Sequence, residues 1–278
     1  MGAGEHGLKR LIVTGDDFGL SLAVNEAVEA AHQNGILTTT CLMVAAPEAA
    51  DAVARAERLA GLAVGLHIVL VRGRPTLPPA EIPALVGSDG LLHGNLFAAG
   101  LRFFFSGAAR RHLASEIRAQ FDAFHATGLA LDHVNAHNHM HLHPTVLGLI
   151  LKIGRDYGLG AVRLPLEPDG GGIAALLLKP WVWLMKSRLK REQVRCNDYL
   201  FGMRHTGSMD RDRLLPVLHT LPDGVSEILC HPATGSWQGA EKQAASFRFA
   251  DELNALVDSD VRSALEQSGA RLIAFRDI

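Results

Sequence analysis

The sequence predicts an α/β fold in which parallel strands curl into a closed or nearly closed barrel. Segments with the pattern of a buried strand alternate with segments that carry the apolar stripe of a helix, which is typical of a parallel sheet covered by helices. The chain of 278 residues is long enough for one large domain of this class. We therefore expect one domain over residues 1–278.

The first part of the chain shows this alternation clearly. The apolar run Leu11-Ile12-Val13 indicates a buried strand, and Ser21 is a suitable N-cap for a helix that stops at Asn34-Gly35. Pro47 then opens a second helix. The expected elements are a strand over 8–15, a helix from Ser21 to Asn34, a strand over 36–44, a helix from Pro47 to about residue 60, and a strand over 62–70.

Residues 71–106 interrupt the alternation. They contain four prolines and several glycines, so we expect a long loop or insertion of the kind that often shapes a substrate cleft. The elements expected after it are a helix over 108–127, a short apolar strand with Leu129, Leu131 and Val134, a helix over 144–157, strands over 161–165 and 225–230, a helical stretch over 247–265, and a last strand over 271–275.

Residues 176–191 stand apart from this pattern. They combine two tryptophans and several leucines with five basic residues, and we expect Pro180 to interrupt any single helix there. The composition fits an amphipathic segment at a membrane interface, and it equally fits a buried helix with a basic end. Residues Leu101–Phe105, with three consecutive phenylalanines, offer a second surface of this kind.

The composition limits the classes of partner. A net charge of −2 and a pI near 6.7 argue against a nucleic-acid partner held through its phosphates. The three cysteines form neither an even disulfide framework nor a CxxC motif, so we expect a reducing, cytoplasmic setting. The N-terminus does not resemble a signal peptide, and no run of 18 apolar residues predicts a membrane span. The oligomeric state stays open, with a homodimer as one alternative.

Polar residues gather where the predicted strands end. Asp16 and Asp17 follow the first strand, His67 lies on the third, and His231 follows a strand near the C-terminus. Five histidines lie within residues 133–143, where an extended backbone would point alternate side chains to opposite sides. Because the carboxyl ends of parallel strands meet at one edge, we expect these residues to share a site.

Each feature also has a simpler structural explanation. The two aspartates could form a turn that leads into a helix, and the histidines could form a solvated loop. Together they favour a metal site, because a cation relieves the repulsion between adjacent carboxylates and histidine is the commonest metal ligand. One aspartate would then be a ligand and the other a base.

These residues resemble the motifs of the YdjC-like carbohydrate deacetylases, and the resemblance covers nearly the whole chain. The motifs are Thr14-Gly15-Asp16-Asp17-Phe18-Gly19, Val64-Gly65-Leu66-His67, the run His137-x-His139-x-His141, and Leu229-Cys230-His231-Pro232. More narrowly, the stretches Asn25–Val28, Pro79–Pro83, Arg102–Phe105 and His133–His137 resemble the branch associated with hopanoid biosynthesis, called HpnK. The sequence departs from the family at Thr14-Gly15, where many members have Asn-Ala, and at Asn138, where some have a further histidine.

The resemblance implies an irregular TIM-like (β/α) barrel of the polysaccharide-deacetylase type, formed by a single catalytic domain. It implies a divalent metal held by Asp17, His67 and His137. Asp16 would be the base that deprotonates a metal-bound water, and His231 would be the acid that protonates the leaving amine. The implied substrate is an N-acetylglucosaminyl group, attached to bacteriohopanetetrol in the hopanoid branch.

The implied ligand set is chemically reasonable for such a reaction. Two imidazoles and one carboxylate leave positions for water and a carbonyl oxygen and fit zinc best, although Mg²⁺, Mn²⁺ and Co²⁺ are not excluded. We further expect Asn135, His139 and Arg163 to contact substrate. For His139, a surface histidine that is only hydrogen-bonded is an equal alternative.

We therefore interpret the chain as a metal-dependent N-deacetylase of an acetylated, lipid-linked amino sugar, cytoplasmic and in peripheral contact with the inner face of the membrane. One alternative is a deacetylase of soluble chitooligosaccharides. Another is a different metal-dependent hydrolase such as a phosphoesterase, for which Arg163 is the main phosphate-facing candidate. A catalytically silent sugar- or lipid-binding protein is disfavoured by the base and acid candidates.

Overall fold

The computed structural model describes residues 8–168, 173–237 and 244–278, with side chains described for the same residues except 173–178 and 245. Residues 1–7, whose sequence gave no sign of a signal peptide, and the side chains of 176–178 lie outside this part. The elements are β1 (Lys9–Phe18), α1 (Leu22–Asn34), β2 (Thr39–Leu42), α2 (Ala49–Arg58), β3 (Ala63–Ile68), η1 (Pro79–Glu81), α3 (Leu96–Phe105), α4 (Gly107–Ala126), β4 (Leu131–Ala136), η2 (His137–Leu142), α5 (Pro144–Gly154), η3 (Arg155–Tyr157), α6 (Ile173–Arg191), β5 (Tyr199–Phe201), α7 (Arg211–His219), β6 (Gly224–Cys230), η4 (Ala244–Ser246), α8 (Phe249–Val257), α9 (Ser259–Ser268), β7 (Arg271–Leu272) and η5 (Phe275–Asp277).

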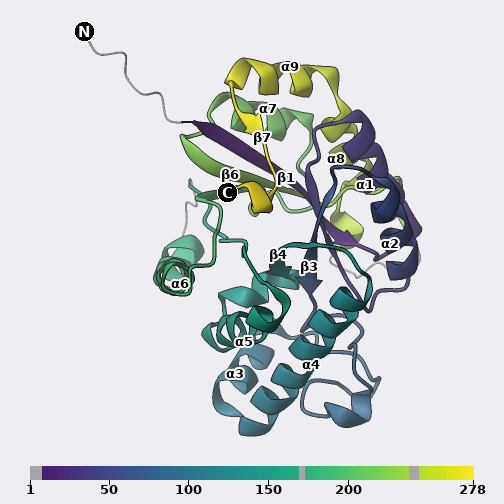
Figure 1. The fold of residues 1–278 in the computed structure, drawn as a ribbon, viewed down its shortest axis with the longest axis vertical. Helices are drawn as coiled ribbons and strands as arrows, with labels where there is room; N and C mark the ends of the chain where they lie inside the picture. The colour runs from purple at the N-terminus through teal and green to yellow at the C-terminus, as the bar shows by residue number, and fades with distance from the viewer. Residues whose placement is uncertain (1–7, 169–172, 238–243) are drawn as a thin grey trace.

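The strands form one sheet with the order β4-β3-β2-β1-β6-β5, and the short β7 pairs with β1. Every ladder between these strands is parallel. The sheet curls into a half-barrel, and helices cover its outside (Figure 1). The predicted α/β class with a parallel sheet is confirmed. The apolar strand residues are buried against the helices, and Leu11, Val13 and Leu66 are fully buried.

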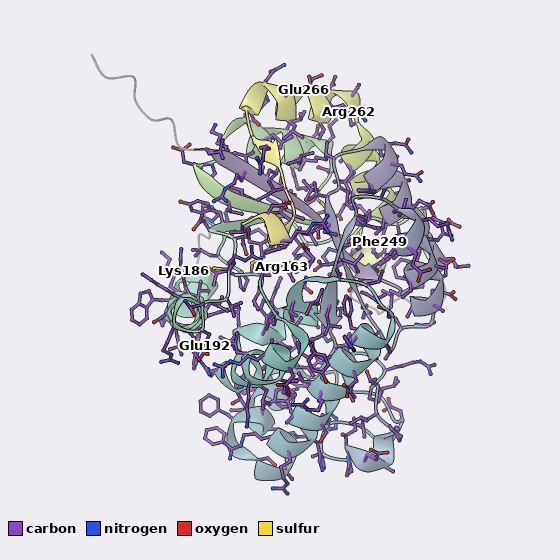
Figure 2. The ribbon with its side chains drawn as sticks, viewed as in Figure 1. Arg163, Lys186, Glu192, Phe249, Arg262 and Glu266 are labelled. Atoms are coloured by element: carbon purple, nitrogen blue, oxygen red, sulfur yellow. The ribbon has the colours of Figure 1, made fainter. Side chains whose placement is uncertain are left out.

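The predicted strand over 161–165 is replaced by a bridging segment that forms only isolated pairs. Its backbone bonds β4 on one side, where Arg163 N donates to Val134 O, and the chain before β5 on the other, where Val162 N donates to Arg195 O. This segment carries Arg163 to the centre of the molecule (Figure 2).

Four further expectations differ from the structure. The predicted loop over 71–106 contains the helix α3, and the predicted helical stretch over 247–265 divides into α8 and α9 because the side chain of Asp258 caps a new helix. The helix α6 runs through Pro180, which we expected to break it. The strand β5 and the helix α7 were not predicted from the sequence.

The insertion between β3 and α3 is anchored by two buried polar side chains of α4. The Glu116 carboxylate accepts hydrogen bonds from the backbone N–H groups of Thr76 and Leu77, at 2.8 and 3.1 Å. The Gln120 amide pairs with the backbone N–H and C=O of Val69. These bonds hold the insertion beside the carboxyl end of the sheet, where it can form one wall of a cavity.

The helices α3 and α6 expose a set of large apolar side chains that we call the α3–α6 apolar surface. Both helices contact the start of α5. Phe104 of α3 lies edge-on to the His143 ring, and Arg188 of α6 donates to the carbonyl oxygen of Pro144. Within residues 8–168, 173–237 and 244–278, none of the helices combines the length and the hydropathy of a membrane span. The exposed residues of this surface are Phe97, Leu101, Phe104, Phe105, Trp181, Trp183 and Leu184.

Candidate metal and catalytic site

The candidate residues come from the carboxyl ends of β1, β3, β4 and β6. β1 extends beyond its predicted end to Phe18, and its pairing with β2 is irregular between Gly15 and Phe18. Asp17 has a left-handed φ of 65°, which is uncommon for a residue other than glycine. In a regular strand, neighbouring side chains point to opposite faces. Because the strand is irregular here, the side chains of Asp16 and Asp17 can both lie on the wall of one cavity.

Asp17, His67 and His137 bring three ligand-type atoms together. Asp17 Oδ1 lies 3.3 Å from His67 Nε2 and 3.3 Å from His137 Nδ1, and the two nitrogens are 3.4 Å apart. Within the described part of the chain, Asp17 Oδ1 has no partner with hydrogen-bond geometry. These three atoms form a group that could hold a metal ion.

The charges of this group stabilise one another. Burial alone would raise the pKa of Asp17, but the imidazoles of His137 and His67 outweigh it and hold that pKa well below its usual range. Burial would lower the pKa of His67, whereas the carboxylates of Asp17 and Asp16 raise it above the ordinary value. The protein without metal therefore favours an anionic Asp17 beside the His67 ring, whose affinity for a proton is raised.

Asp16 is a buried carboxylate surrounded by donors. Arg163 binds it in a bidentate fashion, with Nη1 2.7 Å from Oδ2 and Nη2 2.8 Å from Oδ1. Oδ1 also accepts from the Cys41 thiol at 3.0 Å and from the Asn135 amide at 3.2 Å, while Oδ2 accepts one hydrogen bond from the described residues, that of Arg163. Burial would raise the pKa of Asp16, but Arg163 outweighs it and holds the pKa well below its ordinary value.

Arg163 joins Asp16 to a second buried carboxylate, Glu227 on β6. Its Nη2 lies 2.6 Å from Glu227 Oε1, which also accepts from the Thr14 hydroxyl at 2.7 Å. Arg163 and Glu227 are both fully buried. Glu227 was not predicted as a site residue, although it is the single charged residue within the apolar strand over 225–230, and a buried charge requires a partner.

A second group of potential ligands shares a residue with the first. Asp16, Cys41 and His67 also offer ligand atoms close together. Asp16 is already paired with Arg163, and burial beside Asp16 raises the pKa of Cys41 to about 12, so the thiol keeps its proton. Because a thiol must lose its proton to bind a metal well, the Asp17, His67 and His137 group is the better site.

The histidine run does not continue as an extended strand. β4 ends at Ala136, and Asn138 and His139 both adopt left-handed backbone angles within η2. The rings therefore have separate environments instead of two alternating faces. His133 is buried against Asp132, His141 bonds the Arg163 carbonyl oxygen, and His143 caps α5, so only His137 and His139 line the cavity.

A cavity of about 900 Å³ opens above these residues. Its polar end contains Asp16, Asp17, His67, His137 and His231. His231 is held by its backbone N–H, which donates to the buried carboxylate of Glu252, and its ring lies 5.3 Å from Phe247. Much of the remaining wall comes from the β2–α2 loop and the insertion, and further residues come from the β1–α1 loop, from α4 and from the C-terminal part of the chain. Its apolar residues include Leu20, Met43, Val44, Val69, Leu91, Leu92, Leu96 and Phe247, and its charged residues include Arg72, Arg74 and Asp89.

The three residues that we expected to contact substrate have different positions. His139 lines the cavity, where burial and Arg163 lower its pKa to about 3, so the ring is neutral at ordinary pH. Asn135 and Arg163 are fully buried, do not line the cavity, and use their polar atoms on Asp16, His67 and Glu227. Neither residue lies on the cavity wall, and direct substrate contact by them stays a prediction.

Comparison with known proteins gives a consistent result. A family model described as YdjC-like protein matches residues 10–267. A carbohydrate deacetylase from Vibrio vulnificus strain CMCP6 is 31% identical over 226 residues, which are 81% of this chain and 78% of that protein. A carbohydrate deacetylase from Geobacillus stearothermophilus is 28% identical over 267 residues, which are 96% of each chain.

A solved structure extends the likeness to the fold. A crystal structure from Enterococcus faecalis V583, provisionally described as a cellobiose-phosphate cleavage protein, is 25% identical to this chain with a TM-score of 0.77. The match covers 97% of this chain and 98% of that one. The half-barrel and the segments around it are therefore shared over their whole length.

Proposed function

Because the chain belongs to the YdjC-like family, we propose that it is a carbohydrate N-deacetylase that depends on a divalent metal ion. One observation carries the proposal: a carboxylate oxygen and two imidazole nitrogens form a triangle with sides of 3.3, 3.3 and 3.4 Å beside a second carboxylate, in a large cavity. The similar carbohydrate deacetylases from two bacteria support the reaction class.

Asp17, His67 and His137 fit a metal ion, and zinc best. Ligand atoms about 2.0–2.2 Å from a tetrahedral zinc ion are about 3.3–3.6 Å apart, which agrees with the triangle. Octahedral Mg²⁺, at about 2.0–2.1 Å, would bring neighbouring ligands to about 3 Å and prefers oxygen. When bound, the metal would polarise the acetyl carbonyl and make water a stronger nucleophile at neutral pH.

Asp16 and His231 supply the proton transfers in this proposal. Among the residues that the structure describes, Asp16 Oδ1 accepts from three donors and Oδ2 from one, so Oδ2 keeps a lone pair that can accept a proton from water. His231, on the wall of the same cavity, would give a proton to the nitrogen of the amide as its bond to the acetyl carbon breaks. Water and amide thus become acetate and a free amine.

The cavity supports an N-acetylglucosaminyl substrate with a further attached group. Its volume of about 900 Å³ exceeds the needs of one sugar, and much of the wall away from the ligand triangle is apolar. A lipid-linked sugar, with the hopanoid glycolipid of the resembled HpnK branch as the specific case, suits such a wall. Soluble chitooligosaccharides are the alternative. For a phosphoesterase, the main phosphate-facing candidate Arg163 is buried, whereas Arg72 and Arg74 line the cavity, so the similarity to carbohydrate deacetylases is what favours the deacetylase.

The proposal treats residues 1–278 as one catalytic domain and the sheet as an irregular TIM-like barrel. Bonds from the bridging segment to β4 and to the chain before β5 support a nearly closed arrangement. A cytoplasmic enzyme in peripheral contact with the membrane would meet a lipid-linked substrate at its headgroup.

Replacing Asp17, His67 or His137 with alanine should lower metal occupancy, because each change removes one of only three protein ligands. Elemental analysis after equilibration with zinc would measure the loss. His143→Ala, which changes a histidine outside the triangle, is the matched control and should retain the metal. Full occupancy in any of the three variants would remove that residue from the ligand set.

Asp16→Asn should keep the metal and lose most turnover, since the amide preserves the shape but cannot accept a proton. General acid–base groups contribute about 10²–10⁴ to rate. Acetate release would be measured with a hopanoid-linked N-acetylglucosamine and with chitooligosaccharides. No acetate from either substrate by the zinc-loaded wild type would refute the deacetylase proposal, whereas a variant within a few-fold of wild type would refute only the role of Asp16.

A further inference from the structure

Asn135 lies between two parts of the site without touching the cavity. It stands on the buried strand β4, and the parallel register pairs it directly with His67 on β3. Its side chain is fully buried. Burying an amide is costly unless its donor and acceptor groups are both used, so its contacts indicate why an amide stands here.

The two ends of the Asn135 amide contact different functional residues. The oxygen Oδ1 lies 2.7 Å from His67 Nδ1. The nitrogen Nδ2 lies 3.2 Å from Asp16 Oδ1 and 3.2 Å from the Cys41 sulfur. The amide orientation follows from chemistry, because an ionised Asp16 only accepts hydrogen bonds and must therefore face the NH₂ group.

This orientation fixes which nitrogen of His67 carries the proton. Nδ1 must donate to the amide oxygen, so in the neutral ring the lone pair lies on Nε2. Nε2 is the atom that lies 3.3 Å from Asp17 Oδ1 and 3.4 Å from His137 Nδ1. The tautomer set by Asn135 is thus the one that a metal in the triangle requires.

We propose that Asn135 is a positioning residue that sets the tautomer of the ligand His67 and holds one oxygen of the base Asp16 through the same amide. The inference rests on the proposed function and adds a residue that acts through two others. One amide thus acts on two residues of the site. Its oxygen orients the metal ligand His67, and its NH₂ group orients the carboxylate of Asp16.

Two substitutions separate the two halves. Asn135→Asp keeps an oxygen for His67 Nδ1 but replaces the donor to Asp16 with a second carboxylate. Asn135→Leu has a similar size and removes both interactions. We expect Asn135→Leu to bind zinc 10- to 100-fold more weakly than wild type, the usual effect of losing such a partner. We expect Asn135→Asp to bind zinc within a few-fold of wild type, with a large fall in kcat and little change in KM.

Asn197 provides the matched control. It is also fully buried, but its side chain bonds backbone groups of Leu164 and Tyr199, away from the ligand triangle. Asn197→Leu should therefore destabilise the fold without changing the zinc affinity of the folded protein. Zinc affinity would be measured by competition with a chromogenic chelator, and folding by circular dichroism.

Histidine ¹H–¹⁵N spectra give a readout that does not depend on activity or on the leucine variant. In the zinc-loaded wild type and in Asn135→Asp, we expect His67 to carry its proton on Nδ1 with slow solvent exchange. A His67 protonated on Nε2 would overturn the inference, as would equal zinc affinity in wild type and a folded Asn135→Leu. Failure of the wild type to bind zinc at all would instead count against the proposed function.

Discussion

Asp16 illustrates how a buried carboxylate can be held in place by hydrogen bonds and still keep one oxygen able to accept a proton. Arg163 neutralises its charge, and the donors converge mainly on one oxygen. The cost is a low affinity for protons, because Arg163 holds the pKa of Asp16 well below its ordinary value. Glu227 also forms an ion pair with Arg163, and its negative charge limits how far the guanidinium lowers the pKa of Asp16.

His133 lies behind this site and predicts a pH-dependent stability. Burial would lower its pKa, but the Asp132 carboxylate, 3.1 Å from Nδ1, outweighs burial and raises it to about 9. The unfolded value is about 6.5, so the folded chain binds the proton more tightly. Its stabilising contribution is complete below about pH 6.5 and is lost as the pH rises to about 9.

We therefore expect the unfolding free energy of the metal-free protein to fall by on the order of 3 kcal/mol from this group between about pH 6.5 and 9. His133→Gln should remove that part of the decrease, and the exposed His125→Gln should keep it. Denaturant unfolding at several pH values would measure the difference. An identical pH dependence in His133→Gln and wild type would show that His133 does not carry the extra proton.

At the level of single residues, the sequence indicated that Asp16, Asp17, His67 and His137 would meet, because strand ends share one edge. It did not indicate the hidden partners of these residues. The contacts of Asn135 and Arg163 depend on the sheet register and on the path of the bridging segment. Neither can be read from local composition, which is why both residues were expected to face substrate.

At the level of elements, we expect the α3–α6 apolar surface to contact a partner. Both bury part of their apolar residues, such as Phe103 and Met185, yet leave others in solvent, with Phe105 and Trp183 exposed by 76% and 73%. Basic residues of the same helices, including Lys186 and Arg191, lie among the exposed side chains. Aromatic residues favour the membrane interface, and each basic residue near an anionic surface adds about 1 kcal/mol of attraction.

We expect the wild type to sediment with vesicles of phosphatidylglycerol and phosphatidylcholine at low salt, and less at high salt. Trp181→Ala/Trp183→Ala should weaken the binding. Leu22→Ala, which removes an exposed leucine from another helix, is the control and should bind as wild type does. A folded wild type that stays in the supernatant at low salt would exclude membrane docking while leaving the deacetylase proposal intact.

The element predictions failed where tertiary context decides the backbone. The turn at Asn138 and His139 requires left-handed backbone angles, which are rarely predictable from sequence for residues other than glycine. The histidine run was therefore expected to remain extended. The prolines of the insertion correctly predicted an irregular segment. They also led us to overlook the helix α3, whose N-cap is Asn95. Pro180 was given too much weight, because helix propensity is a weak guide once a helix packs against a domain.

At the scale of the whole molecule, the parallel sheet was predictable because the repeated alternation of strands and helices leaves few other solutions. The sheet order was not, since it places β1 between β2 and β6 and brings together residues more than 200 positions apart. The cavity follows from that order. It lies where β1, β3, β4 and β6 end, and the insertion adds its outer wall.

The central place of β1 also determines when the protein can first work. Lys9 pairs with Gly224 and Gly15 with Cys230, and β7 also pairs with β1, so β1 lacks two of its neighbours until nearly the whole chain has left the ribosome. Contacts of such long sequence separation close slowly. Asp17, His67 and His137 are synthesised first, and Glu227 and His231 come last. We therefore expect the complete site to form only after β6 has been synthesised.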